Sequence, residues 1–446
     1  MVAVDPLSLE REVRQLLADK VSGNLVGLWL LAPEHLRLGT WDLLRCWADP
    51  TPEALAPRLA LHLVHEAALC RPSLRYSRSL RHKGLELANG LPFLPSDTAI
   101  HDLLDAHTVE QAHQLQIRLG LLRRASGHFP AAVLALDPHR QLSYSKRDMV
   151  QRRPTASQPA CKHAQSFFLL DATSCQPICL TQASSAQSIP QASAQLFDLA
   201  QTILGRTRQP PPLITADVEH FSTPLLDLTR QQTPFDLLVP LRYSKNLQQH
   251  YQSLAPEAFT RHWAGFATAT ETFLPEGTTC SAPCYRYIQR TGERPQDYHF
   301  KGFACTALRP EVPTLTRDFP DRWHIEEFFR FDQDLGWKRA GTLNLNVRLG
   351  QMSLALVAQT LIHQLRQRLP EPYRRWDSPH FARDWFSGLE GDIRVEQDTI
   401  VVTYYNAPDA HLWKHHFENL PQQLEHEKVD ARIPWLYNFK LDFRFK

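Results

Sequence analysis

The chain contains 446 residues, of which 43% are hydrophobic and 10% aromatic. This composition excludes an intrinsically disordered chain, and the length leaves room for roughly two or three domains. Lysine and arginine total 49 against 47 for aspartate and glutamate, so the net charge does not indicate a nucleic-acid partner. No apolar run approaches the length of a membrane span, and the N-terminus lacks the apolar segment of a secretory signal. We therefore expect an intracellular protein with no membrane partner.

The cysteines favour free thiols over a metal centre. All eight fit a reducing compartment. Two pairs, Cys175/Cys179 and Cys280/Cys284, have the spacing C-x3-C. A zinc site would need two more ligands near either pair, ideally a second compact pair. Cys175 and Cys179 flank the expected start of a strand, which favours buried thiols.

Residues 1–128 are predicted to form an all-helical DNA-binding domain. Apolar residues recur there at the three- and four-residue spacing of one helix face, in the segments 9–17, 55–67, 100–104 and 109–122. Prolines punctuate these segments, and Ser96 and Asp97 are both candidate N-caps for the third. A helix-turn-helix within residues 96–124 stays open, because no motif identifies it.

The pattern changes at residue 131 to that of a mixed α/β domain, which we place at residues 129–370. A buried strand over 131–136 ends in Asp137, and a hairpin follows over 166–182. The expected elements after it are a helix near 192–204, a strand at 212–217, a helix at 223–231 and a strand at 235–241.

The remaining segments complete this domain and add an extension. Residues 242–297 are less regular and are interpreted as an insertion. The expected elements beyond it are a strand at 298–308, a helix at 322–331 and a long amphipathic helix at 354–369. Residues 371–446 are predicted to form a C-terminal α/β extension, because residues 393–405 and 440–446 alternate apolar and polar side chains.

Three acidic residues lie where a metal-dependent enzyme would use them. Asp137 and Asp217 each follow an apolar strand, and Glu326 lies in a helix after the sheet. Strand ends present side chains to the crevice of an open sheet, and converging carboxylates bind pairs of hard divalent cations. From the residues alone, capping roles for the two aspartates and a solvated surface position for Glu326 remain open.

A family resemblance supports the interpretation of these three acids as metal ligands. The run 322–329, Arg-Trp-His-Ile-Glu-Glu-Phe-Phe, resembles the Arg-x3-Glu element of insertion-sequence DDE transposases. In that group the larger motif is Tyr-x2-Arg-x3-Glu-x6-Lys; Arg322 and Glu326 match it, whereas Phe319 holds the Tyr position and Gln333 the Lys position. The stretches 133–140 and 214–221 resemble the family's first and second catalytic strands, and together these segments span about half of the chain.

The resemblance implies a fold, a site and a reaction. The fold is an RNase H-like mixed sheet flanked by helices, with an insertion before the last catalytic helix. The implied catalytic and metal-binding residues are Asp137, Asp217 and Glu326, which would hold two Mg²⁺ or Mn²⁺ ions. The enzyme would cut transposon ends and join them to target DNA by hydrolysis and transesterification.

The partners follow from the same resemblance. They are double-stranded DNA and a second copy of the chain in the synaptic complex, and the protein would be bacterial, cytoplasmic and nucleoid-associated when bound to DNA. A nuclease that cuts without joining and a non-catalytic DNA-binding remnant are the alternatives.

Two neighbouring acids compete with these assignments. Asp171 also ends an apolar run, but choosing it as the first acid would leave no hairpin between the first and second acids. Glu327 lies beside Glu326, but it would point about 100° away around the helix. We therefore favour Asp137 and Glu326.

Basic clusters are the candidate DNA contacts. One follows Asp137 and contains Arg140, Lys146 and Arg147, and another contains Arg75 and Arg78 at helical spacing. Arg322 of the family motif is a further candidate. Solvated surface positions are the alternative for both clusters. Trp263, Tyr285 and Tyr287 in the insertion would suit stacking on a frayed base, although core packing also explains aromatic residues.

Overall fold

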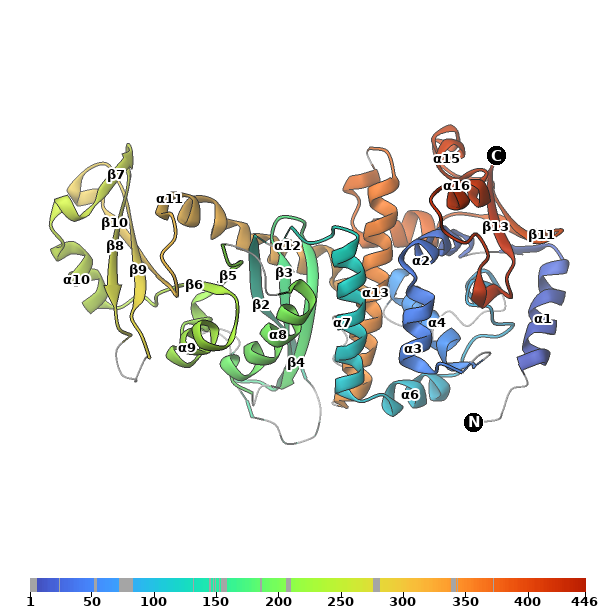
Figure 1. Cartoon of the computed structure of the whole chain (residues 1–446), viewed down its shortest axis with the longest axis horizontal. Coiled ribbons are helices and arrows are strands. Elements are labelled where there is room, and N and C mark those ends of the chain that lie inside the picture. Colours follow the sequence, from blue (N-terminus) through green and yellow to red (C-terminus); the bar gives the residue numbers. More distant parts are fainter. Residues whose placement is uncertain are drawn as a thin grey trace. The chain divides into compact units, whose positions relative to one another are not determined.

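The structure is a computed structural model of the chain (Figure 1). It describes residues 6–446 except residues 24, 52–53, 72–82, 131, 144–145, 147, 149, 152, 154–158, 185–186, 206–209, 276–280, 338–341, 343 and 372. The chain forms two compact units. The terminal unit comprises Met1–Arg123 and Arg330–Lys446, and the central unit comprises Arg124–Phe329. No helix in the described chain has both the length and the apolar character needed to cross a membrane.

The terminal unit combines helices with a small sheet. Its first segment contains α1 (Pro6–Ala18), β1 (Val21–Gly23), η1 (Val26–Leu31), α2 (Ala32–Leu38), α3 (Thr40–Ala48), α4 (Ala56–Ala68), α5 (Lys83–Ala88), α6 (Asp97–Ala106) and α7 (Val109–Ala125). Its second contains α13 (Leu345–Arg368), β11 (Gly391–Glu396), β12 (Thr399–Tyr404), α15 (Ala410–Phe417), α16 (Leu420–His426) and β13 (Lys440–Phe445). The strand order is β1-β11-β12-β13. The four helices predicted before residue 128 are present, and Ser96 caps α6 by accepting a hydrogen bond from the Ala99 amide.

The two ends of the chain therefore share one core, which replaces the separate helical domain and C-terminal extension predicted from the sequence. Val21 of β1 pairs with Ile393 of β11, and the Trp435 indole donates to the Ala88 carbonyl at 2.9 Å. Helix α13, which the sequence predicts as part of the α/β domain, packs on α4 and α6 instead. A three-residue strand and contacts hundreds of positions apart leave no periodic pattern for sequence analysis to detect.

The central unit is built on a nine-stranded sheet with the order β4-β3-β2-β5-β6-β10-β9-β8-β7. The first five strands along the chain are β2 (Val133–Leu142), β3 (His163–Asp171), β4 (Gln176–Ser184), β5 (Leu213–Ala216) and β6 (Asp236–Pro240). Strands β2, β3 and β4 pair antiparallel, whereas β5 is parallel to both β2 and β6. The predicted order of strand, hairpin, helix, strand, helix and strand is observed, with α8 (Ile189–Leu204) and α9 (Thr223–Gln232) as the helices. The predicted mixed α/β class is confirmed.

The segment 242–297 is more regular than the sequence indicated. It contains α10 (Lys245–Ser253), β7 (Thr260–Trp263), β8 (Phe266–Phe273) and β9 (Cys284–Thr291). Strand β10 (His299–Cys305) pairs antiparallel with both β6 and β9, so this segment extends the main sheet (Figure 1). The chain then passes through α11 (Glu311–Pro313), the π-helical turn η6 (Thr314–Asp318) and the 3₁₀ turn η7 (Pro320–Trp323) into α12 (His324–Asp332).

Candidate active site

Two parallel strands bring Asp137 and Asp217 to the same level of the sheet. The last parallel pair between β2 and β5 is Leu136 with Ala216, and the two aspartates are the next residues on each strand. Neighbouring strands lie about 4.8 Å apart, and residues at the same level point to the same face. The backbone at Asp217 is still extended, with φ −78° and ψ 169°. The two carboxylates therefore emerge side by side from one face of the sheet.

The structure corrects one detail of the prediction for Asp137. This residue does not end its strand, because β2 continues to Leu142 and stays paired with β3 over that length. Only the pairing with β5 stops at Leu136, so β2 has no partner strand on that side at Pro138. Proline lacks an amide hydrogen, and it is tolerated there because no hydrogen bond to a neighbouring strand is needed on that side. Asp217 does end β5, and it also caps the short helix that follows by accepting from the Val218 amide at 2.6 Å.

Helix α12 covers the same face of the sheet and carries Glu326. Phe168 lies opposite Asp137 on β3, and its ring is 5.8 Å from that of Phe328 and 5.3 Å from that of Phe329. The His324 ring also lies 2.7 Å from the Ala172 carbonyl oxygen. Glu326 is partly buried, whereas Glu327 is exposed to solvent. The register of α12 therefore brings Glu326, and not Glu327, to the sheet.

Arg322 lies among these acids. Its guanidinium donates to the Glu326 carboxylate at 3.1 Å, one helical turn along the chain. The Arg322 side chain is only 13% exposed, so its charge acts in a partly dehydrated setting. The Arg-x3-Glu pair singled out in the sequence is thus a direct contact.

Asp137 has a strongly perturbed proton affinity. Burial raises its pKa to about 7, and the Arg322 charge opposes that change. The negative charges of Glu219, Asp217 and Glu326 raise the pKa further. Each of these acids is therefore close enough to Asp137 to affect its charge. A half-buried carboxyl surrounded by other carboxylates favours either a proton or a bound cation.

Two charged residues near these acids were missed in the sequence. Glu219, two positions after Asp217, pairs with Arg140 at 2.6 Å. Lys301 of β10 has a lowered pKa, first through burial and then through the charge of Arg322, while Asp217 opposes both. Glu219 was detectable from its position beside the second acid. Lys301 was not, because it reaches the site only through the pairing of β10 with β6.

The rival acid Asp171 has a different role. It is fully buried at the end of β3, where its carboxylate accepts from the amides of Thr173 and Ser174 at 3.0 Å each. It pairs with Leu134, three residues before Asp137, at the opposite end of the parallel pairing. Asp171 thus shapes the hairpin turn, as aspartate commonly does.

The acids match a divalent cation in chemistry and charge, because carboxylate oxygens are the ligands that Mg²⁺ and Mn²⁺ prefer. Within the described residues, however, no three histidine, cysteine or acidic side chains stand together as a metal-binding group. Glu326 is paired with Arg322. It would have to exchange this partner to join the two aspartates at a cation.

The other predicted DNA contacts have varied outcomes. Arg140 lies on β2 near the acids, and Lys146 is exposed, whereas Arg147, Arg75 and Arg78 lie outside the described residues. Among the aromatic residues, Tyr287 is fully buried and its hydroxyl accepts from the Arg309 amide, so it belongs to the core. Tyr285 packs against that core, whereas Trp263 is 49% exposed.

Comparison with protein-family models gives no match to the chain, and comparison with curated proteins gives none either. Among solved structures, the chain is similar to one in the piggyBac transposase synaptic complex with hairpin DNA, determined by cryo-EM. The two share 11% sequence identity over 86% of this chain and 79% of that chain, with a TM-score of 0.38. A TM-score this low does not establish a common fold.

Proposed function

We propose that this chain is a DDE-type DNA transposase whose central unit contains an RNase H-like catalytic core. The observation that carries the proposal is the placement of Asp137 and Asp217 side by side on neighbouring parallel strands, under a helix that supplies Glu326. The strand order β4-β3-β2-β5-β6, with an antiparallel hairpin followed by two parallel strands, agrees with the core expected from the family resemblance.

The three acids would hold two Mg²⁺ or Mn²⁺ ions. Bound there, the cations would activate the attacking oxygen and stabilise the leaving oxygen of a phosphodiester. The chain's own contribution is to hold Asp137 in a half-buried position where neighbouring carboxylates disfavour its charge. A divalent cation would relieve that repulsion, and Asp137 would release its proton on binding it.

Cations of the protein would hold the DNA beside these acids. Arg322 and Arg140 lie close to the carboxylates, and each pairs with a glutamate. Lys301 forms no ion pair with any described carboxylate, and its ammonium lies 5.1 Å from the ring of Phe319, three residues before Arg322. These three side chains are suited to neutralise phosphate charge near the cut bond. In the synaptic complex two copies of the chain would hold two transposon ends.

A cleavage and strand-transfer assay tests the proposal. The substrate is a plasmid that carries the gene with its native flanking DNA, and the full chain is incubated with it in Mg²⁺ or in EDTA. The expected result is Mg²⁺-dependent cutting at the flanks followed by joining to a second plasmid. Asp217→Asn and Glu326→Gln should each lose activity by a factor of at least about 10³, as expected for groups that act on the transition state.

Glu327→Gln is the matched control, because it makes the same chemical change on the exposed neighbour of Glu326. It should cut as the wild-type chain does. Cutting without any joining would support the nuclease alternative instead. Equal cutting by the Glu326 and Glu327 variants would contradict the assignment of the third acid.

A further inference from the structure

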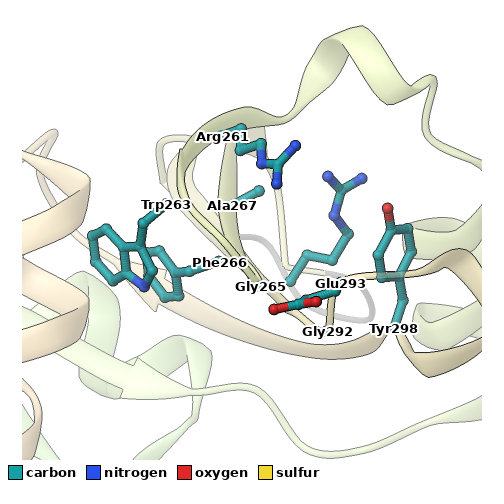
Figure 2. A pocket seen from close by; sticks show the side chains of 9 residues that line it. Arg261, Trp263, Gly265, Phe266, Ala267, Gly292, Glu293 and Tyr298 are labelled. Atoms are coloured by element: carbon teal, nitrogen blue, oxygen red, sulfur yellow. The ribbon is translucent and has the colours of Figure 1, made fainter.

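A small basic pocket lies on the part of the sheet that the sequence indicated only as an insertion. About 290 Å³ of open space is lined by residues of β7, β8, β9 and the loop after β9: Arg261, Trp263, Gly265, Phe266, Ala267, Arg290, Gly292, Glu293 and Tyr298. Figure 2 shows the Arg261 guanidinium and the Tyr298 hydroxyl extending toward the same side of the opening, with the Glu293 carboxylate nearer the base. The opening thus combines guanidinium and hydroxyl donors.

Aromatic rings fix one of the two arginines of this pocket. The Arg290 guanidinium lies 4.5 Å from the ring centre of Phe259 and 4.4 Å from that of Tyr298, so two aromatic faces fix its position. Neither Arg290 nor Arg261 forms an ion pair with any carboxylate that the structure describes. The N–H edges of a guanidinium stacked on aromatic rings remain free to donate to a planar or tetrahedral anion.

The floor of the pocket is a tight backbone turn. Gly265 and Gly292 both have positive φ, 75° and 113°, and the Gly292 amide donates to the Gly265 carbonyl at 3.0 Å. A Cβ at Gly292 would come within 2.2 Å of the Asp297 carbonyl oxygen. Only glycine allows this close approach, which sets the loop carrying Tyr298 against Arg290.

The pocket lies at the same end of the sheet as the catalytic acids. Across the strands, Asp217 is level with Pro240, Phe303, Tyr287 and Thr270. The pocket residues Arg290 and Ala267 lie three positions beyond this level, in the direction in which β5 runs. Four strand spacings of about 4.8 Å and three residues of about 3.3 Å place the pocket on the order of 20 Å from Asp217. This separation corresponds to roughly six base pairs of duplex DNA at 3.4 Å each.

We propose that the Arg261–Arg290 pocket binds one backbone phosphate of DNA, roughly six base pairs from the phosphate that is cut. The inference rests on the proposed function, and it adds an anchoring point outside the catalytic acids. Arg290 points to the face of the sheet opposite to both Lys301 and Asp217. It lies three positions from Tyr287, which is level with Asp217, and it pairs with Phe300, whereas Lys301 pairs with Gln289. The bound duplex therefore passes over the ends of the strands and does not lie along one face.

The test is DNA binding in EDTA, which separates binding from cleavage. Fluorescence anisotropy measures the affinity of the full chain for a duplex from the gene's flanking DNA over a series of salt concentrations. Arg261→Gln and Arg290→Gln should each weaken binding on the order of tenfold, as expected for loss of a charge-assisted hydrogen bond, and lower the salt slope by about one. Arg294→Gln is the control, because it removes the same charge from an exposed neighbour that does not line the pocket.

A second arm leaves the protein unchanged and so does not depend on how the variants fold. Single methylphosphonates, which remove one phosphate charge, are placed along the duplex. For the wild-type chain, the neutral linkage should weaken binding when it lies about four to eight base pairs from the cut bond, a window around the roughly six-base-pair estimate. The same linkage should cost little in the Arg261→Gln chain, because the partner of that phosphate is already missing.

The outcomes separate this inference from the proposed function. If both pocket variants had the same salt slope as Arg294→Gln while the wild-type chain still cleaved DNA, the pocket assignment alone would be overturned. Competition by inorganic phosphate or a mononucleotide as strong as that by the duplex would make a free phosphate the ligand and overturn the assignment to DNA. A wild-type chain that binds no duplex would overturn both proposals.

Discussion

Replacing Asp137 with asparagine should make the metal-free protein more stable at pH 8. Burial and neighbouring carboxylates raise the pKa of Asp137 from an ordinary value of 3.8 to about 7 in the folded chain. The folded state therefore binds a proton more tightly than the unfolded state does. The stability that this proton provides is fully present below about pH 4 and is lost as the pH rises through about 7.

The size of the effect follows from the two pKa values. A tenfold difference in proton affinity corresponds to about 1.4 kcal/mol, so ionising Asp137 costs the folded state on the order of 4 kcal/mol at pH 8. Asparagine keeps the shape of the side chain and has no charge to bury. We expect Asp137→Asn to raise the free energy of unfolding at pH 8 by about 2–4 kcal/mol, and to change it little at pH 4.

Urea denaturation in EDTA at a series of pH values measures this difference, with Glu327→Gln as the control on the exposed side of α12. Saturating Mg²⁺ should stabilise the wild-type chain at pH 8 more than the asparagine variant, because the variant lacks one of the charges that the cation neutralises. If Asp137→Asn were destabilising by the same amount at pH 4 and pH 8, Asp137 would not be the half-buried carboxyl described above.

Three further changes test other parts of the structure. Arg322→Gln removes the cation that lowers the pKa of Asp137, so the pH range over which the metal-free chain loses stability should shift to higher pH. Arg322→Lys keeps the charge and should resemble the wild type. Urea midpoints measured against pH test both variants. Gly292→Ala places a Cβ 2.2 Å from a backbone oxygen and should lower stability by roughly 1–3 kcal/mol. Gly127 also has positive φ but has open space around it, so Gly127→Ala should cost less. Similar melting temperatures for the two alanine variants would contradict this. Asn89→Ala removes a buried amide that joins two histidine rings and should cost about 1–3 kcal/mol in thermal unfolding, and an unchanged midpoint would mean that this network contributes nothing.

The α/β part of the fold was predictable because its central strands contain apolar runs that are buried. All nine residues of β3 are buried, and β5 is buried along its length. Such runs, bounded by turns and followed by an amphipathic helix, define the order of elements without any long-range information. The positions of Asp137 and Asp217 follow, since each is the first residue after its strand's parallel pairing.

The features that could not be predicted from the sequence depend on contacts between distant segments of the chain. Strand β1 has three residues and forms a sheet only because β11, almost four hundred positions later, pairs with it. Strand β2 continues past Pro138 because β3 alone supports it there. Lys301 and the two pocket arginines lie in strands with no sequence motif around them. Their proposed roles depend on which residues the neighbouring strands bring beside them.

Binding of Mn²⁺ tests most directly whether the acids form one metal site. Electron paramagnetic resonance counts free Mn²⁺ during a titration of the full chain at pH 8, without DNA or any need for activity. We predict that the wild-type chain and Glu327→Gln bind Mn²⁺. Asp137→Asn and Asp217→Asn should each bind it at least about tenfold more weakly, because even the loss of a residue that only supports a metal ligand costs roughly 10–100-fold. Equal Mn²⁺ affinity in all four proteins would contradict a metal site at Asp137 and Asp217.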